Sequence, residues 1–185
     1  IQAINNYLGH IDLYLLDSIL KGKVDDKRIV LDAGCGEGRN LTYFSNEKFE
    51  IYGIDREPLA IKMCQMRFQS CPKDHFIIGR LNSMPWKDGF FDLVISSAVL
   101  HFSASHTDFF DMWAEHTRVT KKGGLLFLRM ASKWGLEDPG GEFDFYLDDQ
   151  LLQEMLASGW VTAAPVKTVL VENKRSMSAI LLERR

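Results

Sequence analysis

The chain has 185 residues, of which 46% are hydrophobic and 25% are charged, and its formal net charge at pH 7 is −3. This length fits one domain built on a single core, since domains usually span roughly 100–200 residues. No apolar run approaches the roughly 18 residues of a membrane span, and the slight negative charge creates no positive field for a phosphate backbone. We therefore expect neither a membrane nor nucleic acid as the main partner.

Three cysteines, Cys35, Cys64 and Cys71, are spread through the chain without the spacing of metal ligands. An odd and sparse set of this kind fits a reducing compartment better than a disulfide framework. The chain opens with Ile1-Gln2-Ala3, without the basic segment and apolar core of a secretory signal. We expect a cytoplasmic protein without a metal site, and the composition leaves both a monomer and a homodimer open.

Periodic apolar residues and turn signals predict the elements in chain order. Leu8, Ile11, Leu15 and Ile19 recur at helical spacing and predict one leading helix that ends at residues 21–23. The elements expected after it are a strand at 28–31, a helix through Leu41 and Phe44, a strand at 49–54, a helix at 59–68 opened by Pro58, strands at 75–79 and 91–95, a helix at 105–119 and a strand at 125–128. This alternation predicts a mostly parallel, doubly wound sheet.

The C-terminal part departs from this alternation. A helix that begins at Asp148 or Asp149 and ends at Gly159 is followed by two expected strands, at 165–171 and 177–182. Too few residues separate the two strands for a crossover helix, so they must pair antiparallel as a hairpin. The predicted fold class is α/β, with a Rossmann-like sheet of seven strands in three α/β/α layers, and residues 1–185 form one domain.

A glycine-rich loop, Asp32-Ala-Gly-Cys-Gly-Glu-Gly38, lies directly between the first strand and the following helix. A dinucleotide-binding loop has glycines at its first, third and sixth positions, whereas here they occupy the first, third and fifth, and Arg39 takes the sixth. A carboxylate at Asp32 would repel a pyrophosphate but suits a ligand that carries an ammonium or sulfonium group. S-adenosylmethionine is such a ligand, and Asp55, at the end of the second strand, is placed to accept its ribose hydroxyls.

These motifs, together with the strand Asp92-Leu-Val-Ile-Ser-Ser97, resemble class I S-adenosylmethionine-dependent methyltransferases over nearly the whole chain. The resemblance implies S-adenosylmethionine as cofactor and S-adenosylhomocysteine as product. The cofactor-binding residues that we infer from the resemblance and from the loop are Asp32, Ala33, Gly34, Cys35, Gly36, Gly38, Asn40, Asp55, Arg56, Leu81, Asn82, Ser96 and Ser97. Many family members end the third strand with Gly-Asp, but this chain has Gly79-Arg80. Backbone groups of Leu81 or the side chain of Asn82 can contact the adenine edge instead, and Arg80 either flanks the base or is an exposed surface residue.

A narrower resemblance links Gly36-Glu-Gly-Arg-Asn40 and Glu142-Phe-Asp-Phe-Tyr146 to the tellurite-resistance-type methyltransferases. It implies a small-molecule acceptor, including soft nucleophiles such as a thiol or a chalcogen oxyanion. Hydroxyl and amine acceptors stay open. Two alternative functions stay open: a cofactor-binding regulatory module without turnover, which Arg80 suggests, and a nicotinamide-dependent oxidoreductase, which the glycine spacing disfavours.

Methyl transfer from a sulfonium depends mainly on alignment and on the exclusion of water, so a side-chain catalyst is not required. If the acceptor must lose a proton, His101 after the fourth strand is the candidate base, although a histidine there also serves to orient a neighbour. We expect Tyr14, Arg129 and Tyr146 to contact the substrate. Two segments are expected over the site: residues 1–22 as a leading helix above the cofactor, and 131–147 as a substrate lid.

Overall fold

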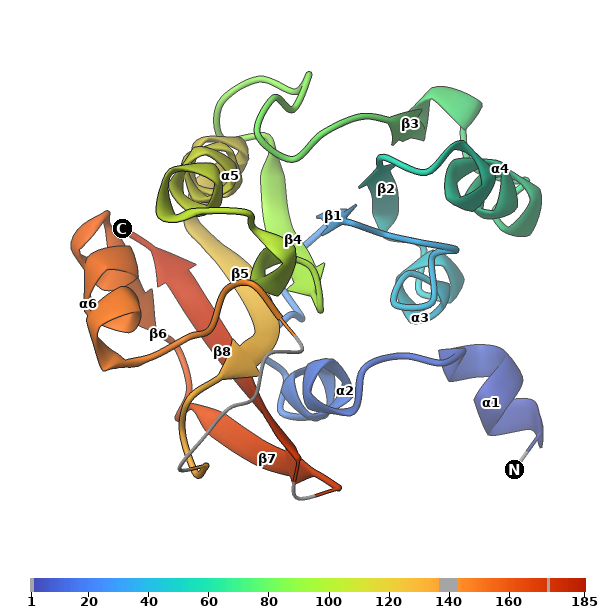
Figure 1. The fold of residues 1–185 in the computed structure, drawn as a ribbon. Coiled ribbons are helices and arrows are strands. Elements are labelled where there is room, and N and C mark those ends of the chain that lie inside the picture. The colour runs from blue at the N-terminus through green and yellow to red at the C-terminus, as the bar shows by residue number, and fades with distance from the viewer. Residues whose placement is uncertain (1, 137–142, 173) are drawn as a thin grey trace.

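The computed structural model describes residues 2–136, 143–172 and 174–185 (Figure 1). Its strands form one sheet in the spatial order β3-β2-β1-β4-β5-β8-β6, and β7 is also paired with β8. The strands are β1 (Ile29–Ala33), β2 (Glu50–Asp55), β3 (Phe76–Ile78), β4 (Phe91–Ser97), β5 (Thr120–Ser132), β6 (Trp160–Thr162), β7 (Lys167–Val171) and β8 (Arg175–Arg184). The first five strands run parallel to their neighbours, and β8 is antiparallel to β5. The predicted fold class is therefore confirmed.

The seventh position of the sheet holds two short strands rather than one. Strand β7 pairs antiparallel with residues 175–179 of β8, and β6 pairs with residues 182–184. The hairpin of β7 and β8 is the one that the sequence predicts, whereas β6 was not predicted. Its three residues are too few to show the alternation by which a strand is recognised.

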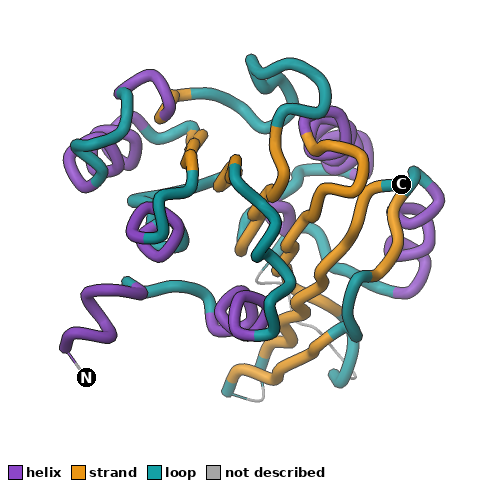
Figure 2. Tube along the Cα trace, turned by 180° about the vertical axis from the view of Figure 1, so that it is seen from behind, coloured by secondary structure: helices purple, strands orange, loops and turns teal. Residues whose placement is uncertain are grey.

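The helices lie on both faces of the sheet, as Figures 1 and 2 show from opposite sides. They are α1 (Gln2–Leu8), α2 (Leu13–Leu20), α3 (Thr42–Asn46), α4 (Pro58–Arg67), α5 (His106–Val119) and α6 (Asp149–Ala157), with single 3-10 turns η1 (Lys73–His75) and η2 (Leu100–Phe102). One core packs α5 and α6 against the sheet, and a second core packs α2, α3 and α4 against its other face. None of the helices described here is long and apolar enough to cross a membrane.

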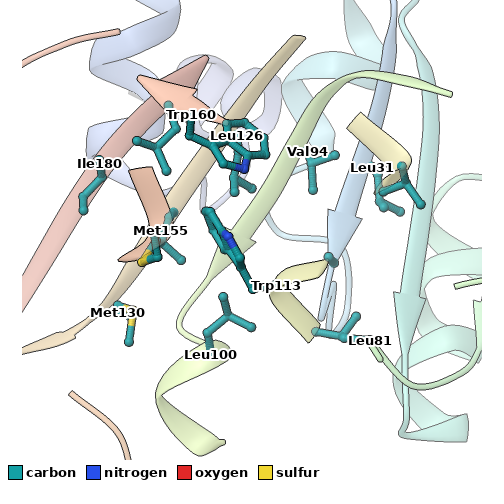
Figure 3. Close-up of a cluster of buried hydrophobic side chains, with 14 of the residues drawn as sticks. Leu31, Leu81, Val94, Leu100, Trp113, Leu126, Met130, Met155, Trp160 and Ile180 are labelled. Atoms are coloured by element: carbon teal, nitrogen blue, oxygen red, sulfur yellow. The ribbon is translucent and has the colours of Figure 1, made fainter. Parts of the chain in front are cut away.

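Alternating side chains of the strands supply these two cores. In β1, Val30 belongs to the core under α2 to α4, whereas Leu31 faces α5 and α6, as a period of two requires. Figure 3 shows the core against α5 and α6, which includes Leu31, Val94 and Leu126 of neighbouring strands with Trp113 of α5 and Met155 of α6. The packing holds the carboxyl ends of the central strands in fixed register.

The connection from β3 to β4 differs from the expected alternation of strands and helices. Residues 79–90, all of which the structure describes, contain no helix. Pro85 removes a backbone donor, and Gly89 adopts a φ of 59°, so a continuous helix is disfavoured here. Trp86 and Phe90 instead pack edge-on against Tyr52, with ring centroids 6.0 and 5.4 Å away.

The prediction of one leading helix within residues 1–22 is wrong, because the structure divides this stretch into α1 and α2. Gly9 breaks the helix at a φ of 67°, and a Cβ there would lie 2.7 Å from Oγ1 of Thr42. Asp12 then caps α2 by accepting a hydrogen bond from the backbone N–H of Tyr14 at 2.9 Å. Ile11, which fits the helical period, is buried in the connection between the two helices.

The expected lid at 131–147 falls partly outside the described residues, which exclude 137–142. Its two ends lie side by side, because the N–H of Leu147 donates to the carbonyl of Ala131 at 2.9 Å and the N–H of Lys133 donates to the carbonyl of Leu147 at 2.8 Å. The segment therefore leaves and rejoins the sheet at the carboxyl end of β5.

Candidate active site

A cavity of about 730 Å³ opens at the carboxyl ends of β1 to β4. The predicted cofactor residues that line it are Gly34, Asp55, Arg56, Leu81 and Asn82. Ligands of open α/β sheets bind at this edge, where the chain leaves the strands and glycine loops admit close approach. Phe102, Asp108 and Met112 complete the wall from the side of η2 and α5.

The glycine loop needs its glycines for two different reasons. Gly34 has a φ of 81°, and a Cβ there would lie 2.4 Å from a methyl group of Val99, so the turn itself excludes a side chain. Gly36 has a φ of 52°, but no described atom lies within 4 Å of its ideal Cβ position. The space beside Gly36 is therefore open, although Gly36 is not among the described residues that line the cavity.

Asp55 fixes the conformation of this loop from the end of β2. Its Oδ2 accepts a hydrogen bond from the N–H of Gly36 at 2.8 Å, and its Oδ1 accepts from the N–H of Glu57 at 3.0 Å. The half-buried carboxylate also lines the cavity. An acceptor in this place suits the hydroxyls of a ribose.

Asp32 lies at the end of β1 with its side chain buried, and neither carboxylate oxygen has a hydrogen-bond partner among the residues that the structure describes. Burial raises the pKa of this carboxyl from 3.8 to about 7, against the opposing effects of the Arg39 charge and the Asn40 amide. A buried acid without a partner is unfavourable until a cation or a donor satisfies it. The ammonium group of S-adenosylmethionine supplies such a partner, so the residues present fit this cofactor.

At the end of β3 the chain presents Arg80, Leu81 and Asn82 to the cavity, and the side chain of Arg80 is exposed. A second carboxylate, Asp108, was missed by the sequence reasoning and lines the same cavity. Its Oδ2 accepts from the N–H of Ala104 at 3.0 Å, and Ser105 caps α5 by accepting from the N–H of Asp108 at 3.1 Å. The Ser-x-x-Asp pattern of a helix start was the available signal, and it marks a cap rather than a site.

The other predicted cofactor residues are not among the described residues that line the cavity. Gly36 is half-buried, and the rest are buried: Asp32, Ala33, Cys35, Gly38, Asn40, Ser96 and Ser97. The thiol of Cys35 lies 3.9 Å from that of Cys64, which in turn contacts the carbonyl of Gly36 at 3.2 Å. Apart from Gly36, the structure therefore divides the predicted cofactor residues into those that line the cavity, the open group, and buried residues that do not, the covered group.

His101 is buried in η2, and its Nδ1 accepts a hydrogen bond from the backbone N–H of Ala131 at 3.0 Å. Burial lowers the pKa of His101 to about 4, helped by the positive charges of Arg129 and Arg175. The ring is thus neutral near pH 7, and its proton lies on Nε2. This arrangement orients the ring and disfavours the role of general base.

The three predicted substrate residues are not brought together on one cavity. Nη1 of Arg129 donates to Oδ2 of Asp12 at 2.9 Å, and the hydroxyl of Tyr146 accepts from the N–H of Phe143 at 3.1 Å. Tyr14 lines a second cavity of about 200 Å³ beside α2, where Nζ of Lys167 lies 5.7 Å from its ring centroid. The ring of Phe143, whose N–H donates to Tyr146, lies 4.2 Å from His101 and 5.6 Å from Phe102, beside the active-site cavity.

Comparison with known proteins agrees with this geometry. The family model described as "Methyltransferase domain" matches residues 31–128, more than half of the chain, so the chain belongs to this family. It is a class I S-adenosylmethionine-dependent methyltransferase, as the order of the sheet and the glycine loop also indicate. Membership in this family decides against the nicotinamide alternative.

Curated relatives share parts of the chain. A phthiotriol/phenolphthiotriol dimycocerosates methyltransferase of Mycobacterium leprae is 32% identical over 132 residues, which are 69% of this chain and 47% of the relative. A malonyl-[acyl-carrier protein] O-methyltransferase of Salmonella typhimurium is 24% identical over 71% of this chain and 53% of its own length. A tRNA (carboxymethyluridine(34)-5-O)-methyltransferase of Arabidopsis thaliana is 30% identical over 66% of this chain and 26% of its own length. The chain spans about half the length, or less, of these relatives.

Solved structures support the fold. A methyltransferase from Methanosarcina mazei superposes with a TM-score of 0.71 at 20% identity, covering 90% of this chain and 96% of the other. TehB from Haemophilus influenzae gives a TM-score of 0.70 at 19% identity, and the match covers 91% of this chain and 62% of TehB. Identities this low speak for the fold alone, and they single out no acceptor.

Proposed function

We propose that this methyltransferase transfers the methyl group of S-adenosylmethionine to a small-molecule acceptor and releases S-adenosylhomocysteine. The observation that carries the proposal is the cavity of about 730 Å³ at the carboxyl edge of the sheet. Its volume falls within the range of about 300–1,000 Å³ that is typical of small-molecule sites. Since the cofactor occupies part of this volume, the remaining space suits a small acceptor or the end of a longer one.

In this proposal each part of the cofactor has a partner on the chain. Asp32 holds the ammonium group, Asp55 accepts the ribose hydroxyls, and Leu81 and Asn82 contact the adenine edge in place of the usual acid. When bound, the cofactor supplies a methyl group on a sulfonium, which is a good leaving group. The protein contributes alignment of the acceptor with this methyl group and exclusion of water.

We further propose that no histidine base assists the transfer. Nδ1 of His101 is engaged by Ala131, and the ring packs against Phe102 and Phe143 with centroids 4.4 and 4.2 Å away. His101 therefore acts as a positioning residue that shapes an aromatic wall beside the cavity. A site of this kind favours acceptors that ionise readily or carry no proton, such as a thiol or a chalcogen oxyanion, over unactivated hydroxyls and amines.

The relatives define the competing acceptors, because their names specify a lipid, an acyl-carrier protein and a tRNA. The net charge of −3 disfavours the tRNA, whose phosphates call for a basic surface. For the acyl-carrier protein and the lipid, the small volume admits only the end of the acceptor. We therefore propose a free small molecule as the principal substrate.

The test is an assay of S-adenosylhomocysteine release with one acceptor at a time: a small thiol, selenite or tellurite, a phenol, an aliphatic alcohol, an amine, malonyl-acyl-carrier protein and tRNA. The proposal expects turnover with the thiol or the chalcogen oxyanion, abolished in Gly36→Ala, where the added methyl fills ligand space. Turnover confined to the carrier protein or the tRNA would overturn the small-molecule proposal.

A further inference from the structure

Asp12, in the connection between α1 and α2, carries a carboxylate that is only 2% exposed. Its Oδ2 accepts from Nη1 of Arg129 at 2.9 Å and from Oγ of Ser97 at 3.2 Å, and Nη2 of Arg39 lies 4.0 Å away. Burial of a carboxylate is unfavourable unless such partners replace its water. Asp12 is therefore held at the carboxyl ends of two strands that are distant from it in sequence.

The same connection is tied to the glycine loop. The N–H of Asp12 donates to Oδ1 of Asn40 at 3.0 Å, and Arg39 donates to the carbonyl of His10 and to Oγ of Ser97, both at 3.2 Å. Ser97 and Arg129 are direct neighbours in the register of β4 and β5. The connection thus spans the loop and both strand ends.

The connection between α1 and α2 separates the open group of cofactor residues from the covered group. Gly34 and Asp55 line the cavity, whereas Asp32, Asn40 and Ser97 are at most 8% exposed and lie on the covered side. In the proposed placement of the cofactor, the open group faces the nucleoside and Asp32 faces the amino-acid end. The amino-acid end of the site is therefore closed in this structure.

Three buried groups in the covered region lack hydrogen-bond partners within the described part of the chain: the carboxylate of Asp32, Oγ of Ser96 and Nε of Arg129, of which Asp32 and Arg129 are ionisable. Asp32 is an acceptor that suits a cation, and Arg129 is a cationic donor that suits an anion. An amino-acid zwitterion carries both complementary charges. Asp12 already supplies Arg129 with a carboxylate, at Nη1.

We propose that the Asp12 carboxylate is a displaceable substitute for the carboxylate of the cofactor: it holds the N-terminal connection closed on Arg129, and the cofactor takes its place there. Arg129 then binds the cofactor's carboxylate and is not a substrate residue, while Asp12 acts as a positioning residue. The inference rests on the proposed placement of the cofactor. It predicts that Asp12 competes with the ligand for the same guanidinium group.

The test compares S-adenosylmethionine with decarboxylated S-adenosylmethionine, which keeps the ammonium group but lacks the carboxylate. Dissociation constants are measured by calorimetry for the wild type, Asp12→Asn, Arg129→Met and Arg129→Lys. The wild type is expected to prefer the intact cofactor by about tenfold, as for a charged hydrogen bond. The preference should vanish in Arg129→Met, survive in part in Arg129→Lys, and increase severalfold in Asp12→Asn, because the competing carboxylate is gone.

Asp17→Asn is the matched control, since Asp17 lies on α2 but pairs with Lys21 and Lys167 instead. It should leave the preference unchanged. An unchanged preference in Asp12→Asn, or one that survives in Arg129→Met, would overturn the proposed displacement of Asp12 by the cofactor, while the methyltransferase proposal stands. Failure of the wild type to bind either compound would instead overturn the proposed cofactor placement. Should Arg129→Met not fold, the Asp12→Asn result decides alone.

Discussion

The backbone N–H of Gly36 donates to Oδ2 of Asp55 at 2.8 Å, so the acid that is placed to bind the ribose also holds the glycine loop. The second oxygen of Asp55 accepts from Glu57 and fixes the turn after β2. One side chain therefore couples the shape of the loop to the recognition of the ligand. Its loss must affect both.

Asp55→Ala is expected to weaken binding of S-adenosylhomocysteine by at least about 100-fold, and to lower the free energy of unfolding by about 1–2 kcal/mol through two unpaired backbone donors. Asp92→Ala is the matched control, because Asp92 also accepts two backbone N–H groups, from Arg28 and Ile29, at the opposite end of the sheet. It should lose comparable stability and keep its affinity. Calorimetry and urea denaturation measure the two quantities, and equal losses of affinity in both variants would contradict the assignment.

The two alanine substitutions in the loop should separate stability from cofactor binding. Gly34→Ala places a methyl group against Val99 and is expected to destabilise the fold by about 2–4 kcal/mol. Gly36→Ala enters open space, so it should lower the free energy of unfolding by only about 1 kcal/mol, from its positive φ, yet abolish cofactor binding. Thermal unfolding and ligand titration of both variants check this; retained affinity in Gly36→Ala would show that the ligand lies elsewhere.

Asp32 should make the ligand-free protein less stable as the pH rises. Its pKa is about 7 in the folded state, so between about pH 4 and 7 the folded protein binds a proton that the unfolded chain has lost. The free energy of unfolding therefore falls with rising pH in this window, by about 4 kcal/mol in all, and the penalty is complete above pH 7. Asp32→Asn should remove this dependence and stabilise the protein at pH 8.

The cofactor's ammonium group favours the ionised carboxylate, so binding of S-adenosylhomocysteine below pH 7 should release a proton and strengthen with rising pH. Calorimetry in buffers of different ionisation enthalpy measures that proton. Asp26→Asn is the control, because the side chain of Asp26 is 78% exposed. Proton release that persists in Asp32→Asn would assign it to another group.

His101 should behave as a structural acceptor rather than a base. In His101→Asn the amide oxygen can still accept from Ala131, so stability and turnover should stay near those of the wild type. In His101→Leu the buried N–H of Ala131 loses its partner, at a cost of about 1–3 kcal/mol. Denaturation curves and pH–rate profiles distinguish the roles. A loss of turnover rate of about 100-fold or more in His101→Asn, with normal stability, would show that His101 acts as a general base.

The parts of this protein that are encoded locally were predictable. The loop from Asp32 to Gly38 carries its signal within seven residues, and the strands around it show uninterrupted apolar runs. The break of the leading helix was harder to predict, because Ile11 keeps the helical period while Gly9 depends on a close approach to Thr42. The pairing of Asp12 with Arg129 joins residues 117 apart in sequence, and no local pattern indicates it.

The same contrast between local signals and distant contacts holds for the site residues. Asp55 and Gly34 were predicted because strand ends and glycines mark them, whereas Asp108 resembles an ordinary helix cap in sequence. Arg129 was identified as a binding residue, but the sequence does not reveal that a carboxylate of the same chain occupies it. Burial also decides the role of His101, since the contact with Ala131 depends on how η2 packs against β5.

In the proposed site, the glycine loop and Asp55 together hold S-adenosylmethionine. This placement is tested most directly by calorimetric titration of the protein with S-adenosylmethionine, S-adenosylhomocysteine and NADH, with Asp55→Ala alongside. We expect saturable binding of both sulfur nucleotides at one site, loss of that binding in Asp55→Ala, and no heat from NADH. Binding of NADH alone, or undiminished binding of S-adenosylhomocysteine to Asp55→Ala, would contradict this placement.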